Sequence, residues 1–210
     1  MNLFHFLWQN HEQILELTRE HLWLVGISTL LAVLIGIPLG IVSAHWPVWN
    51  TPVLGTANII QTIPSLALFG FLLPVPWLGD HADRLAILAL TLYALLPVIR
   101  NTYTGIRGVD PAVVEAGRGM GLTGRQLLVQ VELPLALSVI LSGVRVAVVV
   151  SVGLATIAAA IGAGGLGEFI FRGLAMVNNQ LILAGAIPAA VLALSADFGL
   201  GWLEKRLRPR

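Results

Sequence analysis

The sequence predicts an all-α membrane protein with about five transmembrane helices. A polar connection at residues 110–134, between the third and the fourth, is expected to form an elbow of two short helices. The chain is 57% hydrophobic and 11% charged, whereas a soluble domain carries roughly 25% charged residues. Five apolar runs are each long enough to cross a bilayer, which takes about 20 residues. Lipid offers the backbone no hydrogen-bond partners, so these runs are expected to be helices rather than open strands.

The expected spans follow one another through the whole chain. Their ranges are 21–44, 52–73, 85–103, 135–161 and 181–203. Residues 1–19 precede them and mix apolar side chains with His and Glu, a pattern typical of an amphipathic helix. This helix is expected on the outer side, where it either lies on the membrane surface or packs on neighbouring helices. Residues 20–204 therefore form the expected membrane domain, and a basic cytoplasmic tail follows at 205–210.

The basic residues predict which side of the membrane each connection occupies, because Lys and Arg accumulate on the cytoplasmic side. Arginines gather around the third connection, at Arg100, Arg107, Arg118 and Arg125, and further basic residues fill the tail. Two spans separate these regions, so both can be cytoplasmic. The N-terminus is then expected outside and the C-terminus inside.

Polar residues inside the spans are candidates for a pathway through the membrane. Gln61, Thr62, Pro64 and Ser65 lie in the second span, where proline breaks a helix and frees backbone carbonyls. This segment either lines a pathway or forms a buried kink, and it is expected to face the bundle interior. Arg145 lies within the fourth span, where a charge is costly. It is expected either to bind a partner on another helix or to act in gating or passage.

Glycines predict two further features. Gly36 with Gly40, and Gly143 with Ala147, have the four-residue spacing that lets helix backbones approach closely, and packing is favoured over a role in a moving gate. Residues 162–167 spell GxGxxG, but a dinucleotide site needs a strand before this pattern. Here a membrane helix precedes it, so we expect a compact turn that leads into a segment skirting or re-entering the membrane.

The polar connection 110–134 begins with the signals of a short helix. Asp110 suits the N-cap and Pro111 the first helical position. The helix is expected to run to Arg118, after which Gly119 and Gly121 supply the backbone freedom for a sharp turn.

A second short helix is expected after this turn. Thr123 and Gln126 have the spacing of a capping box, so the helix should cover residues 124–131. Pro134 is expected to mark its join to the fourth span. The connection is therefore predicted to be a helix–turn–helix elbow held between two membrane helices, suited to dock on a partner protein.

The spacing within this elbow also has a known counterpart. The pattern resembles the EAA loop of type I ABC-importer permeases. It consists of Glu-Ala-small, three residues, Gly, nine residues, an aliphatic residue, one residue and then Leu-Pro. The resemblance implies that the loop docks onto a cytoplasmic ATPase. The matching positions are Glu115, Ala116, Gly117, Gly121, Leu133 and Pro134. Gly117 replaces the more common alanine and is expected to loosen the helix locally without abolishing docking.

Further segments resemble the osmoprotectant branch of that family, which takes up glycine betaine, choline and carnitine. They are residues 61–68, 96–102, 109–134 and 158–167. The resemblance implies a type I importer permease core in the bacterial cytoplasmic membrane. It implies a second permease subunit, identical or homologous, two ATP-binding subunits and a separate extracytoplasmic substrate-binding protein. No P-loop is present in the sequence, so ATP and Mg are expected on the partner ATPase and no cofactor on this chain.

Two alternatives remain open from the sequence. The first is an importer permease for another small solute, such as an amino acid. The second is an intramembrane enzyme, for which only the isolated Arg145 and Asp197 offer charged groups at membrane depth. Asp197 is otherwise expected to extend to the membrane interface or to anchor the helix end. The histidines show no metal-ligand spacing and are expected at the interfaces. Absent cysteines exclude disulfides and thiolate metal sites, and a net charge of +1 gives no indication of nucleic-acid binding.

Overall fold

The computed structural model describes residues 3–207, and this part of the chain contains helices and no strand. Ten α-helices occur there, together with a π-helical turn and a short 3-10 turn that extend α8 at its two ends. The α-helices are α1 (Leu3–Gln9), α2 (His11–His45), α3 (Pro47–Thr62), α4 (Ser65–Leu72), α5 (Ala82–Arg107), α6 (Pro111–Gly119), α7 (Gly124–Leu127), α8 (Leu133–Ala158), α9 (Gly167–Ala175) and α10 (Asn179–Arg206). The all-helical class expected from composition is confirmed.

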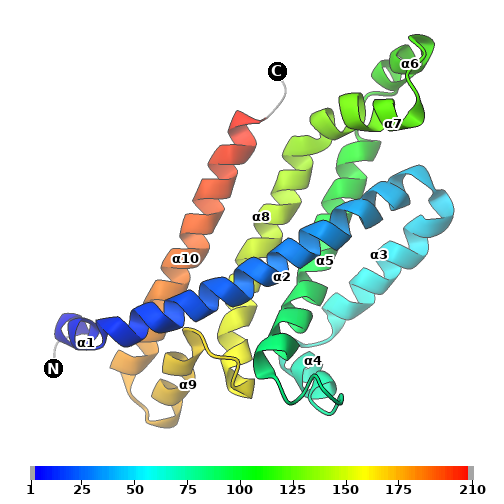
Figure 1. Cartoon of the computed structure of the whole chain (residues 1–210). Helices are drawn as coiled ribbons and strands as arrows, with labels where there is room; N and C mark the ends of the chain where they lie inside the picture. The colour runs from blue at the N-terminus through cyan, green and yellow to red at the C-terminus, as the bar shows by residue number, and fades with distance from the viewer. Residues whose placement is uncertain (1–2, 208–210) are drawn as a thin grey trace.

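The long helices form one bundle with α5 at its centre. In its most apolar window α5 is 67% buried, whereas the corresponding windows of α2, the α8 segment and α10 are 28%, 33% and 22% buried. The outer three thus keep apolar faces that lipid or another membrane subunit can cover. Figure 1 shows α6 and α7 at the end of the bundle where α10 finishes, and α4 and α9 at the opposite end.

The N-terminal segment is not one separate helix, and it packs on neighbouring helices, which is one of the two locations expected for it. A break at Asn10 separates the short α1 from α2, which begins at His11 and runs unbroken for 35 residues. Leu17 is buried in a cluster with Leu166 and Phe169 of the α9 region. Residues 11–19 therefore belong to the first long helix, because their apolar side packs on neighbouring helices. At about 52 Å, α2 exceeds the bilayer core and crosses its neighbours obliquely.

The expected second span at 52–73 is not one continuous helix. Helices α3 and α4 meet at a bend of 99° around Ile63 and Pro64. The residue before a proline avoids the helical region, and Ile63 is extended at φ −69° and ψ 127°. The described residues thus hold four continuous candidate spans, or five crossings if the bent pair is counted as one.

Small residues bring the helices of the bundle into close contact. A Cβ added to Gly40 would lie 2.5 Å from Cβ of Thr102, and one added to Gly143 would lie 2.5 Å from Cβ of Asn101. Both contacts are made with α5, from α2 on one side and α8 on the other. The packing role expected for the four-residue spacing is confirmed, because any larger side chain would separate these backbones.

The glycine-rich turn before α9 is also confirmed. Gly162, Gly164 and Gly165 have φ near +81°, a region that favours glycine. The turn is tied to α2, since the Gly165 N–H donates to Oε2 of Glu20 over 2.9 Å. His21 lies beside it, fully buried, with Nε2 3.1 Å from the Val152 carbonyl oxygen. The burial of this histidine was not expected from the sequence, because it depends on the turn that folds over it.

Candidate functional site

The elbow expected at 110–134 starts with the capped helix that the sequence indicates. Oδ1 of Asp110 accepts from the Ala112 N–H over 2.8 Å, and Pro111 occupies the first turn of α6. The Thr123 hydroxyl accepts from the Gln126 N–H, and the Gln126 side chain accepts in return from the Thr123 N–H over 2.8 Å. Both caps are confirmed, and together they fix where the two helices of the elbow begin.

Gly121 makes the turn between the two helices. Its φ of +84° is left-handed, while its N–H donates to the Arg118 carbonyl over 2.9 Å. The next N–H, of Leu122, donates to the Gly117 carbonyl over 3.2 Å. These two bonds form a Schellman motif, in which glycine at the left-handed position closes the helix end. The elbow therefore needs Gly121 for its backbone conformation, since a Cβ there would meet no atom within 4 Å.

Gly117 has a packing role in the elbow that the sequence did not indicate. It is buried, and an added Cβ would lie 2.7 Å from Cδ1 of Leu127 and 3.4 Å from Cδ1 of Leu122. The glycine thus lets the first helix of the elbow pack directly on Leu127 of α7. The expected loosening takes no account of this contact, because helix propensity describes the isolated helix and not its packing.

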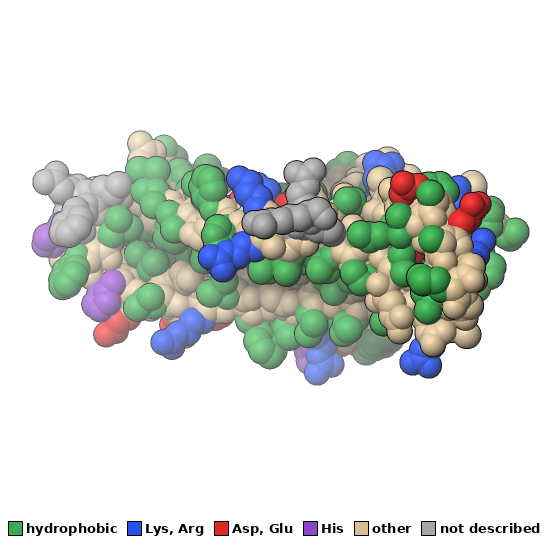
Figure 2. Space-filling model, turned by 90° about the horizontal axis from the view of Figure 1, so that it is seen from above, with side chains coloured by type: hydrophobic (Ala, Val, Ile, Leu, Met, Phe, Trp, Pro, Cys, Tyr) green, Lys and Arg blue, Asp and Glu red, His purple; other side chains and the backbone are tan. Residues whose placement is uncertain are grey.

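The outer surface of the elbow mixes charge with exposed apolar side chains. Glu115 and Ala116 are exposed, as are Val113 at 42% and Met120 at 76%. Seen from the elbow end in Figure 2, acidic and basic side chains gather over the elbow beside hydrophobic ones. A pocket of about 340 Å³ lies beneath, lined in part by Glu115, Arg118 and Arg107. Such a surface suits protein docking, because it is too charged for the lipid core.

The join to α8 is continuous rather than broken at Pro134. The helical path runs from Gly124 to Ile161, through a π-helical turn at Leu128–Glu132. Proline cannot donate a backbone hydrogen bond and clashes with the carbonyl four residues earlier. The π-turn widens the helix there, since the Leu133 N–H donates to the Leu128 carbonyl five residues back. Leu133 packs against the cluster around Ala44 and Ile140, so elbow and α8 are rigidly linked.

Glu132 ties this junction to a second membrane helix. Its Oε2 lies 2.9 Å from Nε2 of His45, the last residue of α2, and the carboxylate side chain is only 9% exposed. Nδ1 of His45 lies 3.1 Å from the Ile41 carbonyl oxygen. This contact joins residues 87 positions apart, so no local pattern in the sequence indicates it. The elbow is therefore attached to α5, α8 and α2.

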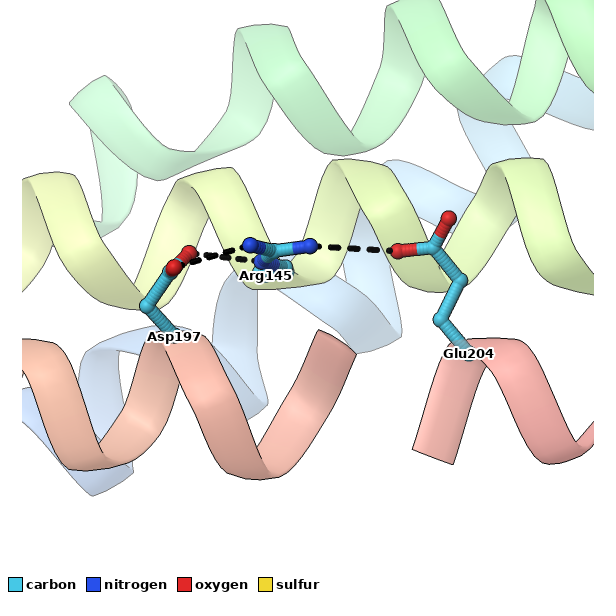
Figure 3. Close-up of polar contacts among 3 residues, drawn as sticks. All are labelled: Arg145, Asp197 and Glu204. Atoms are coloured by element: carbon cyan, nitrogen blue, oxygen red, sulfur yellow. Dashed lines mark hydrogen bonds and ion pairs between the residues drawn. The ribbon is translucent and has the colours of Figure 1, made fainter. Parts of the chain in front are cut away.

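Arg145 pairs with carboxylates on another helix, which is one of the two roles expected for it. Nε and Nη2 donate to Oδ1 and Oδ2 of Asp197 over 2.6 and 2.8 Å, and Nη1 lies 3.6 Å from Oε2 of Glu204 (Figure 3). Both carboxylates lie on α10. Asp197 was expected to extend to the interface or to anchor the helix end, and the pairing with Arg145 was not expected. The bidentate guanidinium stabilises this carboxylate within the span. The contact of Arg145 with Glu204 was not predicted from the sequence.

The residues around Pro64 lie at the bend between α3 and α4. Thr62 and Pro64 are exposed in the single chain, while Gln61 and Ser65 are half-buried, so the expected location inside this bundle was wrong for the first two. The carbonyl of Ile63 accepts a hydrogen bond from the Tyr93 hydroxyl of α5. The polar contacts of Arg145, by contrast, are made with α10. A pathway role for Gln61, Thr62, Pro64, Ser65 and Arg145 stays a prediction.

A bundle of long apolar helices with a charged elbow tethered at both ends defines a multi-pass membrane protein. The chain belongs to the family of binding-protein-dependent transport system inner membrane components, whose profile matches residues 36–209.

Characterised relatives are similar over nearly their whole length. The carnitine transport permease protein OpuCB of Listeria monocytogenes is 44% identical over 98% of this chain and 93% of its own. The choline transport system permease protein OpuBD of Bacillus subtilis is 45% identical over 96% and 88%. The osmoprotectant import permease protein OsmW of Salmonella typhimurium is 42% identical over 100% and 99%.

Solved structures have the same fold at lower sequence identity. An inward-facing MetNI methionine ABC transporter chain aligns with a TM-score of 0.82 at 22% identity, covering 98% of both chains. A chain of an amino acid ABC transporter aligns with a TM-score of 0.79 at 19% identity, covering 98% of this chain and 99% of its own. The fold is therefore that of type I ABC-importer permeases.

Proposed function

We propose that this chain is the membrane-spanning permease subunit of an ABC importer that takes up osmoprotectants, such as glycine betaine, choline or carnitine. The similarity over nearly the whole chain to permeases named for these solutes carries the proposal. The elbow supports the mechanical part of it, since α6 and α7 present an exposed, rigidly tethered surface to a partner. On this surface an ATPase docks against Glu115, Ala116 and Gly121.

The attachments of the elbow explain how it can move the membrane helices. α5 leads into it, the π-turn and α8 lead out of it, and the His45–Glu132 contact links it to α2. A push on the elbow is therefore passed to three long helices. ATP binding by the partner would stabilise one arrangement of these helices, and hydrolysis would return the other, as in a two-state equilibrium biased by a ligand.

The assembly that this mechanism requires has several further members. Two permease chains, identical or homologous, enclose the pathway, and two ATP-binding subunits hold ATP and Mg. A separate extracytoplasmic protein delivers the cargo. The elbow and the end of α10 face the cytoplasm, which is consistent with their arginines and lysines and with their position at one end of the bundle.

Selection of the cargo is assigned to the delivering protein. Quaternary ammonium groups are recognised by aromatic cages, whereas aromatic residues make up 7% of this chain. An amino acid remains the second candidate cargo, since two solved structures with this fold are amino acid or methionine transporters. Their identities of 22% and 19% support the fold alone, and the relatives above 40% identity are named for osmoprotectants.

The test is uptake by the complete complex reconstituted in liposomes with ATP inside. Labelled glycine betaine, choline and carnitine are each offered with the binding protein, with methionine and histidine as comparison solutes. We expect ATP-dependent uptake of at least one osmoprotectant. The variant Glu115→Lys reverses a charge on the docking surface and is expected to lower uptake on the order of tenfold or more, with the complex still inserted in the membrane.

Lys205→Glu is the control, because it reverses an exposed charge beyond the elbow at the same end of the bundle. It is expected to transport like the wild type. Uptake of methionine or histidine without any osmoprotectant would overturn the cargo assignment. Unchanged transport in Glu115→Lys would overturn docking at α6.

A further inference from the structure

Arg145 faces two carboxylates on one helix and binds them unequally. It is bidentate with Asp197, at 2.6 and 2.8 Å, while Glu204 is 3.6 Å from its remaining nitrogen. Figure 3 shows the guanidinium lying between the two side chains, with Asp197 and Glu204 on opposite sides of it. One cation with two acids leaves one carboxylate short of a full partner. Within the described part of the chain, no other ion pair joins α8 and α10.

The spacing on α10 places the two carboxylates on the same face. They are seven residues apart, which is close to two helical turns and about 10 Å along the axis. Gly201 lies between them, and a Cβ there would be 2.8 Å from Nη1 of Arg145. Because Gly201 has no side chain, the guanidinium can occupy the space beside it. Only a small axial shift of α10 is needed to exchange the two carboxylates.

Glu204 also has polar surroundings that can hold it when it is not fully paired. It lines a pocket of about 230 Å³ together with Asn101, Ser138 and Ser142. These side chains come from α5 and α8 and offer hydroxyl and amide groups. A carboxylate facing such a pocket can keep hydrogen bonds to water or to these groups, so its partial release by Arg145 is tolerated within the membrane.

We propose that Arg145, Asp197 and Glu204 are positioning residues that hold α10 in two alternative registers on α8 during transport. In the register seen here the guanidinium is bidentate with Asp197. In the other, α10 shifts by roughly 1–2 Å and the guanidinium is bidentate with Glu204. Arg145 is never left unpaired, so neither register carries the cost of an isolated charge in the membrane. This inference rests on the proposed transport function.

The decisive prediction is that removing one carboxylate shifts α10 in one direction, and removing the other carboxylate shifts it in the opposite direction. Asp197→Asn leaves Glu204 as the charged partner and favours the second register. Glu204→Gln leaves Asp197 and favours the first. A contact that only stabilises the fold would give two weakened variants without opposite shifts. Lysine cannot replace the bidentate fork, so Arg145→Lys is expected to reduce the preference for either register and to lower uptake on the order of tenfold.

The measurement uses spin labels on α8 and α10 in the complete complex in nanodiscs. The chain has no cysteine, so Leu135→Cys and Val191→Cys, both exposed, give one label on each helix. Labelled chains are diluted with unlabelled ones. We expect the wild-type distance distribution to change between the nucleotide-free and ATP-bound complexes. Asp197→Asn and Glu204→Gln should each enrich one of the two distances on the order of tenfold.

Gly201→Ala and Gly199→Ala form a matched pair. Only the first adds a methyl group against the guanidinium, since a Cβ at Gly199 meets nothing within 4 Å. Gly201→Ala is expected to slow the exchange and uptake, and Gly199→Ala to behave like the wild type. If the wild type transports and changes distance but the two carboxylate variants shift alike or not at all, the two-register proposal is overturned. A wild type that neither transports nor responds to ATP would instead overturn the proposed function.

Discussion

At the scale of single residues, Gly121 controls the shape of the elbow through its backbone alone. Gly121→Ala is expected to strain the turn by about 1–2 kcal/mol, because the Cβ of an L-residue in the left-handed region lies too close to the following carbonyl oxygen. The Schellman bonds of Gly121 and Leu122 should weaken, and ATP-dependent uptake should fall. Hydrogen–deuterium exchange of residues 117–123 measures the loosening, with uptake measured in parallel.

Gly119→Ala, at the end of α6 just before this turn, provides the comparison. Gly119 is not among the residues with positive φ, and its added Cβ would meet nothing within 4 Å. The change should slow local exchange, since alanine is favoured over glycine in a helix by roughly 0.5–1 kcal/mol. Equal exchange in the two variants would contradict the role given to the left-handed turn.

Single residues also show what sequence patterns can and cannot reveal. The caps at Asp110 and Thr123 were predictable because their hydrogen bonds reach only two or three residues along the chain. The packing role of Gly117 was not predicted, since its contact with Leu127 depends on how the elbow folds back. Asp197 lies 52 residues from Arg145. The cost of a buried charge indicates that a partner exists, but not which residue it is.

At the scale of elements, the bend between α3 and α4 depends on one side chain from α5. Ile63 is the extended residue before Pro64, and its carbonyl accepts from the Tyr93 hydroxyl. Tyr93→Phe removes that donor and is expected to cost about 1–3 kcal/mol of stability. Thermal unfolding in detergent measures the loss, and faster hydrogen–deuterium exchange at residues 65–70 would locate it at the bend.

Tyr103→Phe is the matched substitution on the same helix. The Tyr103 hydroxyl accepts from the Asn50 side chain over 3.2 Å, far along α5 from the bend. Its loss should leave exchange at residues 65–70 unchanged. The assignment of Tyr93 to the bend would be wrong if both variants opened that segment equally.

Hydropathy located the spans better than it located their interruptions. The third, fourth and fifth spans lie within α5, the α8 segment and α10, because apolar length alone decides membrane crossing. Pro64 was expected to break a helix, and Pro134 to mark the join between the elbow and the fourth span. Only Pro64 interrupts the helical path, since a π-turn absorbs Pro134 while nothing comparable precedes Pro64. The difference lies in backbone geometry that composition does not encode.

At the scale of the whole molecule, the order of the helices places different elements at the two ends of the bundle. One end carries the elbow and the end of α10, and the other carries α4, α9 and α1 (Figure 1). An odd number of crossings separates the chain termini if α3 and α4 count as one. Charge predicts that the elbow end is cytoplasmic, where an ATPase can reach it.

Two exposed positions at opposite ends allow this orientation to be tested directly. Met120 in the elbow is 76% exposed, and Val177 after α9 is 88% exposed. With no natural cysteine, Met120→Cys and Val177→Cys each give a single thiol. A membrane-impermeant maleimide should label Val177→Cys in spheroplasts, and Met120→Cys only after the membrane is opened. Because the ATPase is expected to cover α6, its co-expression should then protect Met120→Cys but not Val177→Cys. Labelling of Met120→Cys from outside would place the elbow away from every source of ATP, and neither docking nor the transport mechanism could then hold.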